Sequence, residues 1–334
     1  MKVATIRIDN PKTQLESRDG ALVVVSHDAK RLAKVPNSEY PSLARALEQW
    51  DDALVRLQDI FSQLELGKWQ DTLASESVSF MAPLPRTYAW LDGSAFIQHI
   101  ILVRKARGAE PPETLETVPL MYQGISDTLK GPNDDILAID EAHGIDFEAE
   151  VGVVLSDVPM ATKAADAAQY IKLIVLMNDV SLRNLIPAEL AAGFGFFHGK
   201  PSTSFAPFAI TPDELGSAWR DTKVHLPLVS ILNDKPFGEP NAGEMHFSFA
   251  QLIEHAAKTR ALSAGTIIGS GTVSNRDESV GSSCLAEKRM LEKIHAGEIQ
   301  TPFMKFGDRI ELEMFKDGKS LFGRIDQRVA KYQG

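Results

Sequence analysis

Two glutamates separated by a single residue are the first side chains in this sequence whose spacing could do chemistry. Glu148 and Glu150 lie in the stretch IDFEAEVGVVL, residues 145–155, in which largely apolar and polar positions alternate. Alternation with period two predicts a half-buried strand, on which the two carboxylates share one face about 7 Å apart, given a rise of ~3.3 Å per residue. Such carboxylates repel each other unless a cation lies between them or water screens both. The two interpretations are a cation site and an edge strand with a solvated acidic face.

Asp92 and His99 form a second group, seven residues apart. Asp92 stands at a predicted turn beside Gly93, and His99 lies in the apolar run FIQHIILV. A single histidine in an apolar run is more often a core residue with both ring nitrogens hydrogen-bonded than a catalytic base. Both interpretations of His99 stay open on these residues alone.

Asp179 and Lys200 are the third pair of charged residues in otherwise apolar surroundings. The run LIVLM (173–177) predicts a buried strand that ends at Asn178-Asp179. Asp179 is therefore either a ligand delivered at the end of a strand or the cap of the following turn. Lys200 ends the segment GFGFFHGK (193–200), which lacks the spacing of a phosphate-binding loop. It is either a solvated loop residue or a cation placed in a site.

The elements that must position these residues divide the chain into two parts. Residues 1–80 predict a small structural module, with strands at Val3–Ile8 and Ala21–Ser26 and a helical pattern from Ser42 to Leu64. The two prolines of MAPLPR (81–86) favour extended backbone and mark a boundary. We therefore expect a second, larger domain over residues 81–334.

Within the larger part, turn signals predict two hairpins and a capped helix. Asn233-Asp234 joins Val224–Leu232 to Lys235–Phe237, and Lys316-Asp-Gly318 leads into Leu321–Ile325. Ser248 is the expected cap of a helix over Phe249–Lys258. The glycine-rich stretch 265–272 predicts a place where the backbone approaches another group closely.

Glu311-x-Glu313 repeats the spacing of Glu148-x-Glu150 and serves as an internal comparison. Arg309 and Lys316 flank it, and the second hairpin contains it. We therefore predict a solvated face for this pair. Spacing alone does not separate the two pairs.

Composition excludes several classes of protein. The 334 residues carry a formal net charge of −10 with no sustained basic run, which argues against binding to nucleic acid. Cys284 is the only cysteine, so an internal disulfide and a thiolate metal cluster are excluded. No apolar N-terminal segment and no apolar run of about 18 residues is present, and we expect a cytoplasmic protein without a membrane span.

Taken in series, several motifs resemble the fumarylacetoacetate hydrolase family over residues 82–329. Their order and intervals fit the family, although none is specific alone. Residues 1–80 are similar, less distinctly, to the small N-terminal domain of its longer members. The motifs are MAPLPR (81–86), Asp92 with His99, DFEAEVGVV (146–154), LMNDVSLRN (176–184), HGKPSTSFAPFAITPDEL (198–215) and GSGTVS (269–274).

The resemblance implies an α+β, β-rich fold, a rolled mixed β-sheet with a small N-terminal β/α domain, and a two-fold homodimer. It also implies a metal site formed by Asp92, Glu148, Glu150 and Asp179. All four are hard oxygen donors, which select Mg²⁺ or Ca²⁺ over zinc or copper. Four carboxylates around one divalent ion leave an excess negative charge, which Arg183 and Lys200 would offset.

The resemblance further assigns catalytic and substrate-binding roles. His99 matches the family's general base, and Glu287 is the best match for the glutamate that orients it. Arg183 and Lys200 match groups that hold the developing oxyanion. The predicted substrate contacts are Tyr122, Thr272 and one basic residue of the irregular segment 104–120, either Arg104 or Arg107, of which we select Arg107.

Two positions depart from the family's hydrolases. Ile186 stands where they carry a glutamine that partners the oxyanion-site arginine, and Ser94 stands where they carry a tyrosine. Both are substrate-recognising positions, so the departures bear on the substrate more than on the metal site.

Three functions follow as hypotheses. The leading one is metal-dependent hydrolysis of a carbon–carbon bond in a β-diketo acid, with fumarylacetoacetate cleaved to fumarate and acetoacetate in aromatic amino-acid breakdown. The second keeps the fold and metal for acylpyruvate hydrolysis, oxaloacetate decarboxylation, or hydration or isomerisation of a 2-oxo acid. The third is a non-catalytic binding protein whose cation stiffens the fold. An oriented His99–Glu287 pair beside an open metal position favours an enzyme.

Overall fold

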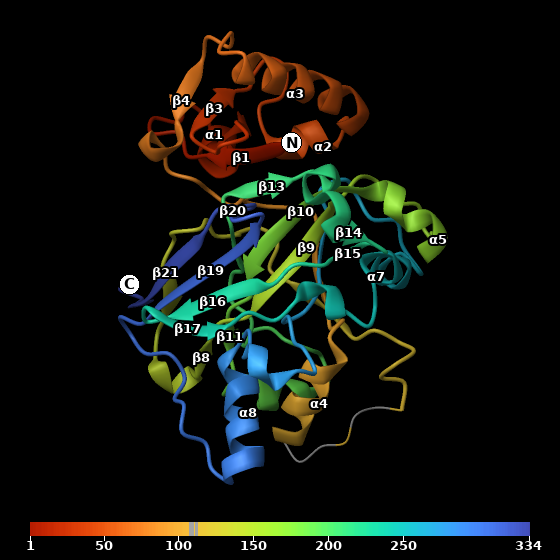
Figure 1. The fold of residues 1–334 in the computed structure, drawn as a ribbon, viewed down its shortest axis with the longest axis vertical. Coiled ribbons are helices and arrows are strands. Elements are labelled where there is room, and N and C mark those ends of the chain that lie inside the picture. The colour runs from red at the N-terminus through yellow and green to blue at the C-terminus, as the bar shows by residue number, and fades with distance from the viewer. Residues whose placement is uncertain (107–109, 111–112) are drawn as a thin grey trace.

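A mixed sheet of 11 strands runs through the molecule, in a computed structural model that describes residues 1–106, 110 and 113–334 (Figure 1). Its strands are antiparallel neighbours except β18 and β5, which are parallel. In spatial order they are β4 (Thr72–Ala74), β3 (Arg31–Lys34), β2 (Ala21–Val25), β1 (Lys2–Ile6), β13 (Phe208–Ile210), β10 (Ile171–Asn178), β9 (Ala149–Leu155), β18 (Ile267–Gly269), β5 (Trp90–Gly93) and β6 (Met121–Gly124), with β12 (Ser204–Phe205) also paired to β10.

A second sheet of six strands packs against the first and completes a β-rich, α+β fold, as predicted. Figure 1 shows its long strands crossing in front of β9 and β10. Its strands are β17 (Lys235–Gly238), β16 (Leu228–Leu232), β19 (Arg309–Lys316), β21 (Ile325–Lys331) and β7 (Ile136–Ala138), with β20 (Lys319–Ser320) paired to β19; two short pairs join β8 (Ile145–Asp146) to β11 (Ser181–Leu182) and β14 (Trp219–Arg220) to β15 (Lys223–Val224).

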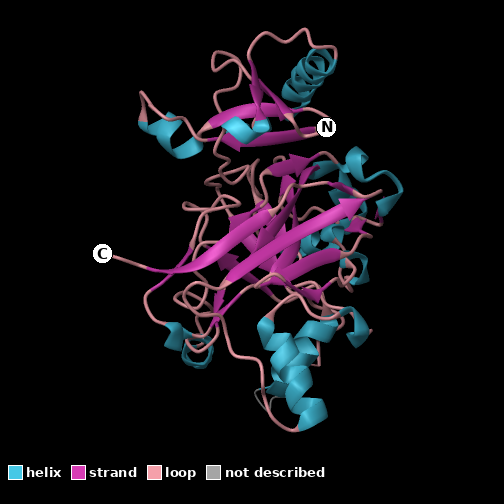
Figure 2. Cartoon of the chain, turned by 60° about the vertical axis from the view of Figure 1, so that its left-hand side comes forward, coloured by secondary structure: helices cyan, strands magenta, loops and turns pink. Residues whose placement is uncertain are grey.

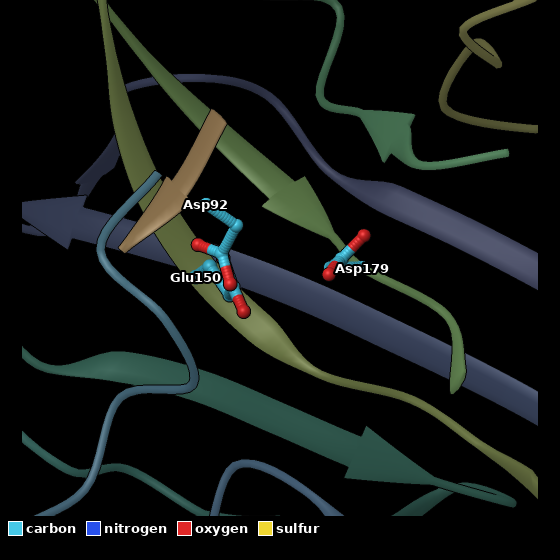
Figure 3. A group of neighbouring side chains, drawn as sticks. All are labelled: Asp92, Glu150 and Asp179. Atoms are coloured by element: carbon cyan, nitrogen blue, oxygen red, sulfur yellow. The ribbon is translucent and has the colours of Figure 1, made fainter. Parts of the chain in front are cut away.

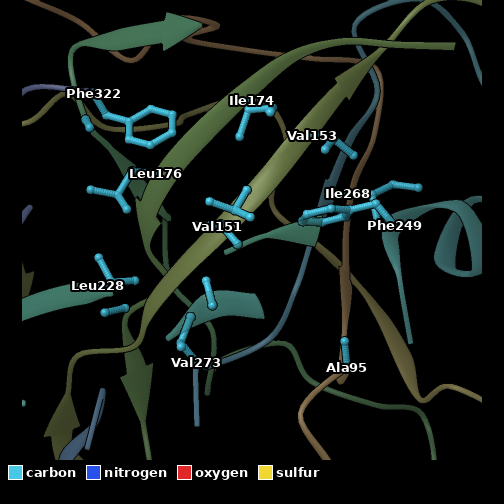
Figure 4. Packing of buried hydrophobic residues seen from close by; sticks show 14 of the residues in the cluster. Ala95, Val151, Val153, Ile174, Leu176, Leu228, Phe249, Ile268, Val273 and Phe322 are labelled. Atoms are coloured by element: carbon cyan, nitrogen blue, oxygen red, sulfur yellow. The ribbon is translucent and has the colours of Figure 1, made fainter. Parts of the chain in front are cut away.

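The central strand β9 differs from its sequence-based prediction. It is buried at every position, and it lies between β10 and β18 rather than at an edge. Val151 and Val153 pack into one apolar cluster and Val154 into another, because both faces of the sheet are covered (Figure 4). The interpretation of a half-buried strand with a solvated acidic face is therefore wrong. The predicted strand is also interrupted at Phe147–Glu148, which separate β8 from β9.

The first 80 residues form three helices and strands β1–β4, and their sheet continues into the rest of the chain. Lys2 pairs with Ile210, so β1 hydrogen-bonds β13 directly. The helical pattern predicted from Ser42 becomes two helices, with a break at Glu48–Gln49. The apolar faces of these helices share a core with Leu173, Val175 and Met177 of β10. The helices are α1 (Gln14–Asp19), α2 (Leu43–Leu47) and α3 (Trp50–Glu65).

Two helices of the larger part lie at the end of the molecule opposite residues 1–80 (Figures 1 and 2). There α4 (Ile97–Ala106) packs against α8 (Leu285–Ala296). The predicted cap at Ser248 is confirmed, because Ser248 and Gln251 form a reciprocal capping box at the start of α7 (Phe249–Ala256). The remaining helices are α5 (Ala164–Ala167) and α6 (Ile186–Ala192).

The first hairpin is confirmed and the second is corrected. Asn233 and Asp234 both have positive φ and join β16 to β17. The turn after Lys316 leads only into the two-residue β20, and the longer strands that flank β19 are β16 and β21. Within the described residues, no helix has the length and apolar composition that crossing a lipid bilayer requires.

The prediction of a solvated face is wrong for Glu311, because this residue is buried. The side chain is only 8% exposed, but it forms ion pairs with Arg309 and Arg324. Glu313 pairs with Arg324 as well. The pair is thus neutralised by Arg309 on β19 and by Arg324 directly before β21, which distinguishes it from Glu150.

Candidate active site

Three carboxylates from different strands meet on the central sheet. Asp92 lies on β5, Glu150 on β9, and Asp179 directly after β10 (Figure 3). One oxygen of each lies within 4.8 Å of the others, and all three side chains are buried. The sheet order explains the meeting, since β10, β9, β18 and β5 are successive neighbours.

Glycines let these strands approach closely enough. Gly269 on β18 pairs with Asp92, and a Cβ atom there would lie 2.6 Å from an Asp92 carboxylate oxygen. The next loop places the N–H of Gly271 against the same carboxylate, at 2.9 Å. Gly271 has a φ of +75°, a conformation that favours glycine. The GSGTVS motif therefore contributes backbone, as its glycine content predicted.

The electrostatics of this group favour a bound cation. Both carboxylate oxygens of Glu150 are buried without a hydrogen-bond partner among the described residues. Burial, together with Asp92 and Asp179, raises the pKa of Glu150 well above its usual value. Burial and the charge of Asp179 raise the pKa of Asp92 to about 8. A divalent ion would remove both penalties, and an all-carboxylate donor set suits hard cations such as Mg²⁺, Mn²⁺ or Ca²⁺.

Glu148 lies apart from the three clustered carboxylates. Arg183 donates to one of its oxygens at 2.5 Å, and Lys200 donates to the other. Burial alone would raise the pKa of Glu148, but the charges of Arg183 and Lys200 lower it below its usual range. The structure therefore gives Glu148 two cationic side chains as partners, whereas Glu150 has none.

Asp179 is the most heavily hydrogen-bonded of the clustered carboxylates. It accepts from Lys200 at 2.7 Å, from Thr203 at 2.6 Å and from Tyr122 at 2.5 Å. Burial lowers the pKa of Lys200, but Asp179 and Glu148 outweigh that effect and raise it. Lys200 is thus a buried cation and not a solvated loop residue. Asp179 does not cap a helix, since β11 follows it and α6 begins only at Ile186.

His99 and Glu287 meet across two helices that are far apart in the sequence. The Nδ1 atom of His99 lies 3.1 Å from a carboxylate oxygen of Glu287. The Glu287 side chain is 2% exposed and that of His99 is 14% exposed, so the carboxylate lies behind the imidazole. The pair can fix the imidazole orientation and stabilise its protonated form.

A cavity of about 370 Å³ is lined by several of these groups. Its polar side includes His99, Asp92 and Thr272, and Arg104 lines it while donating to the carbonyl oxygen of Glu110 at 3.1 Å. Arg107, the predicted substrate contact, lies outside the described residues. The apolar wall of the cavity comes from α4, α6 and neighbouring segments: Phe96, Ile100, Val103, Leu120, Met121, Ile186, Leu190 and Phe196. Tyr122, Arg183 and Lys200 also line the cavity, as does Ser94.

Several residues around the site have no counterpart among the sequence-based predictions. Thr203 fixes Asp179, and the apolar wall is not recognisable before α4 and α6 are placed together. Asp146 is wholly buried, and it accepts from Arg183 and from two backbone N–H groups of α8. Its position two residues before Glu148 in the alternating stretch was the one available signal.

Comparisons with known proteins agree with this architecture. The model of the fumarylacetoacetase N-terminal domain 2 matches residues 1–86, and that of the fumarylacetoacetate hydrolase C-terminal domain matches residues 89–330. The chain is 31% identical over 162 residues to a 2,4-didehydro-3-deoxy-L-rhamnonate hydrolase of Sphingomonas sp. (strain SKA58), covering 47% of this chain and 54% of the relative. It is 22% identical over 240 residues to a mitochondrial oxaloacetate tautomerase of Homo sapiens, covering 69% and 68%. The chain thus spans little more than half of the first relative and about two thirds of the second.

Solved structures show the same fold over the whole chain. Maleylpyruvate hydrolase from Sphingobium sp. SYK-6 superposes with a TM-score of 0.66 at 13% identity, covering 99% of this chain and 100% of that one. A second structure of that hydrolase contains manganese(II) and pyruvate and gives a TM-score of 0.65 at 15% identity, with both chains fully covered. At such identities the likeness concerns the fold alone. With the C-terminal model matching residues 89–330, the chain belongs to the fumarylacetoacetate hydrolase family.

Proposed function

We propose that this protein is an enzyme that hydrolyses a carbon–carbon bond in a small β-diketo acid with the help of a divalent metal ion. The observation that carries this proposal is the His99–Glu287 pair, whose histidine lines the same cavity as Asp92. A cation that only stiffened the fold would have no use for an oriented base beside it. The names of two relatives, a rhamnonate hydrolase and a maleylpyruvate hydrolase, fit hydrolysis of a small oxo acid.

Asp92, Glu150 and Asp179 would hold the ion, which supplies Lewis-acid polarisation of the substrate's carbonyl oxygens. Glu148 lies outside this group of three, so its predicted role as a ligand remains a prediction. Its present partners give it another use, since it holds Arg183 and Lys200 at the edge of the cavity.

The chain's own residues account for the proton transfers. His99 takes a proton from a water molecule while the water oxygen bonds to a substrate carbonyl carbon. Arg183 and Lys200, which line the cavity, direct positive charge at the carbonyl oxygen as it becomes negative. The carbon–carbon bond then breaks, its electron pair stays with the departing enolate, and the proton held by His99 protonates that carbon. Water is consumed and two acids are released.

Fumarylacetoacetate remains the leading substrate of this proposal, with fumarate and acetoacetate as products. Tyr122 and Thr272 line the cavity and can contact one end of such an acid. Arg104 lines it as well and can meet a second carboxylate. The apolar wall suits the hydrocarbon segment between the two ends.

A second candidate keeps the site but omits the attack by water. Ile186 and Ser94 line the cavity at the positions where the family's hydrolases carry a glutamine and a tyrosine, so the amide and the phenol are missing. His99 could then move a proton between carbon and oxygen of a 2-oxo acid, an isomerisation or tautomerisation. The oxaloacetate tautomerase among the relatives and a structural neighbour named as a delta-isomerase fit this alternative. Acylpyruvate hydrolysis, oxaloacetate decarboxylation and 2-oxo acid hydration belong to the same substrate panel.

One assay separates these functions. Fumarylacetoacetate, acylpyruvates, oxaloacetate and 2-hydroxy-dienoic acids would be offered with Mg²⁺, Mn²⁺ or Ca²⁺, and products identified by mass spectrometry. We expect cleavage of a diketo acid by the unaltered chain and none by Glu150→Ala. Isomerised substrate without cleavage supports the second candidate, and metal binding without turnover of any compound supports a binding protein.

A further inference from the structure

Asp146 is a fully buried carboxylate whose contacts join two separate parts of the proposed active site. It lies on β8, whose pairing with β11 places Ser181 opposite it. One oxygen accepts from the backbone N–H of Leu285 at 2.7 Å. The other accepts from the N–H of Ala286 at 2.9 Å and from the Nε atom of Arg183 at 2.8 Å.

The first of these parts is the place in the cavity where Arg183 is proposed to stabilise the negatively charged oxygen. Arg183 bonds Asp146 through Nε and Glu148 through Nη2, so two carboxylates fix the plane of its guanidinium. The arginine side chain is 10% exposed, and it lines the cavity. Because a guanidinium has five N–H donors, donors remain for a substrate oxygen after these two contacts. Removing Asp146 would release one edge of this plane.

The second part is the base. Leu285 and Ala286 are the first two residues of α8, and Glu287 is the third. The helix has only a weak cap of its own, since the N–H of Glu287 donates to the sulfur of Cys284 at 3.4 Å. A carboxylate that accepts from the first turn also interacts favourably with the helix dipole. Asp146 therefore anchors the turn that presents Glu287 to His99.

We propose that Asp146 is a positioning residue that couples the orientation of Arg183 to that of the His99–Glu287 pair. It touches neither the cavity nor the clustered carboxylates, and its effect on the reaction passes through Arg183 and α8. Its role in the reaction rests on the proposed function. The physical link between the two parts does not depend on the proposed function, and it can be measured without a substrate.

Hydrogen exchange tests the link directly. Asp146→Asn keeps the size of the side chain but loses the charge and presents an amide group where acceptors are needed. We expect faster exchange in segments 181–186 and 284–290 together, measured by mass spectrometry on the full chain. Unchanged exchange in either segment would overturn the proposal. If the variant does not fold, Asp146→Glu takes its place, because it keeps the charge but displaces it by one methylene.

A double-mutant cycle tests the effect on catalysis. We expect Asp146→Asn to lower kcat at least tenfold with a smaller change in KM, and to cost much less when Glu287→Gln is already present. A role limited to fold stability predicts equal losses in both backgrounds and overturns the proposal. Ser248→Ala is the matched control: it removes the cap of α7, lowers the melting temperature by a few degrees, and leaves kcat unchanged. If the unaltered chain turns over no compound, the proposed function fails, and the exchange result alone decides the link.

Discussion

At the residue scale, Glu150 shows most directly that the site lacks a compensating positive charge when no cation is bound. Its two oxygens are buried and have no partner among the described residues, so its ionised form is stable only beside a positive charge. We expect Mn²⁺ or Mg²⁺ to raise the melting temperature of the unaltered chain. An ion at 100 times its Kd contributes about 2.7 kcal/mol. Glu150→Gln should abolish that shift while raising the stability of the metal-free protein, as measured by calorimetry with and without metal.

Glu313→Gln is the control for this prediction. Glu313 belongs to a pair with the same spacing as Glu148 and Glu150, but Arg324 neutralises it at 2.8 Å. The substitution should therefore leave the metal-induced shift intact. An equal loss of the shift in both variants would contradict a site at Glu150.

His99 and Glu287 give a second prediction at this scale. Replacing His99 with Ala removes the group that takes the proton, and general bases contribute roughly 10²- to 10⁴-fold to rates. Replacing Glu287 with Gln keeps the base but loses its charged partner, so the loss of kcat should be smaller. Steady-state kinetics measure both losses. Metal-induced stabilisation should persist in each variant, and full turnover by His99→Ala would remove the base assignment.

The identities of the clustered residues were accessible from the sequence, but their partners were not. Asp92, Glu150 and Asp179 could be selected through family resemblance and donor chemistry. The same reasoning treated Glu148 and Glu150 alike because they have the same spacing. Their environments differ because Arg183 and Lys200 reach one and not the other, and side-chain reach from distant segments is not encoded in local spacing.

At the scale of single elements, β18 controls how closely the strands that carry the clustered carboxylates approach each other. A Cβ at Gly269 would lie 2.3 Å from the Trp90 ring and 2.6 Å from an Asp92 oxygen, and these two groups cannot both move aside. Gly269→Ala should therefore cost about 1–3 kcal/mol and weaken metal binding, as calorimetry and metal titration would show. Gly67→Ala is the comparison, since no atom lies within 4 Å of the added carbon although its φ is +68°. If Gly67→Ala lowered the free energy of unfolding more than Gly269→Ala does, the packing at β18 would be looser than the structure implies.

The elements themselves were predicted unevenly. The turn at Asn233-Asp234 and the cap at Ser248 follow from local chemistry, and both are present. The burial of β9 does not follow from its alternating pattern, because helices and a second sheet cover both of its faces. The meeting of α4 with α8 is a contact between residues nearly 190 positions apart, as the separation of 188 between His99 and Glu287 shows.

At the scale of the whole molecule, the first 80 residues complete the sheet and the core. Without them β13 would lose its neighbour β1, and Leu173 and Val175 would lose the helices' apolar cover. We expect residues 81–334 expressed alone to aggregate, because an unpaired strand beside exposed apolar surface favours association. Size-exclusion chromatography measures this. Co-expression of residues 1–80 should restore a discrete species, and a soluble, folded fragment without them would contradict the prediction.

The dependence of stability on pH joins the metal site to the whole fold. In the metal-free protein the pKa of Asp92 is raised to about 8 and that of Glu150 is also raised, so the folded state keeps protons that the unfolded chain releases at lower pH. The folded state binds more protons than the unfolded state in this range, so the free energy of unfolding falls as pH rises towards and through 8. The low pKa of Glu148 contributes stability that is lost only in acid, outside this range.

Melting temperatures between pH 6 and 9 test this dependence. We expect them to fall with rising pH when a chelator is present. The stabilisation by added Mg²⁺ or Mn²⁺ should grow over the same interval, because the ion replaces the protons that the carboxylates release. Asp92→Asn removes one of these titrating groups and should flatten the metal-free profile. A metal-free melting temperature that stays constant from pH 6 to 9 would contradict the prediction. It would mean that other groups of the fold already neutralise the clustered carboxylates, so that no divalent ion is needed.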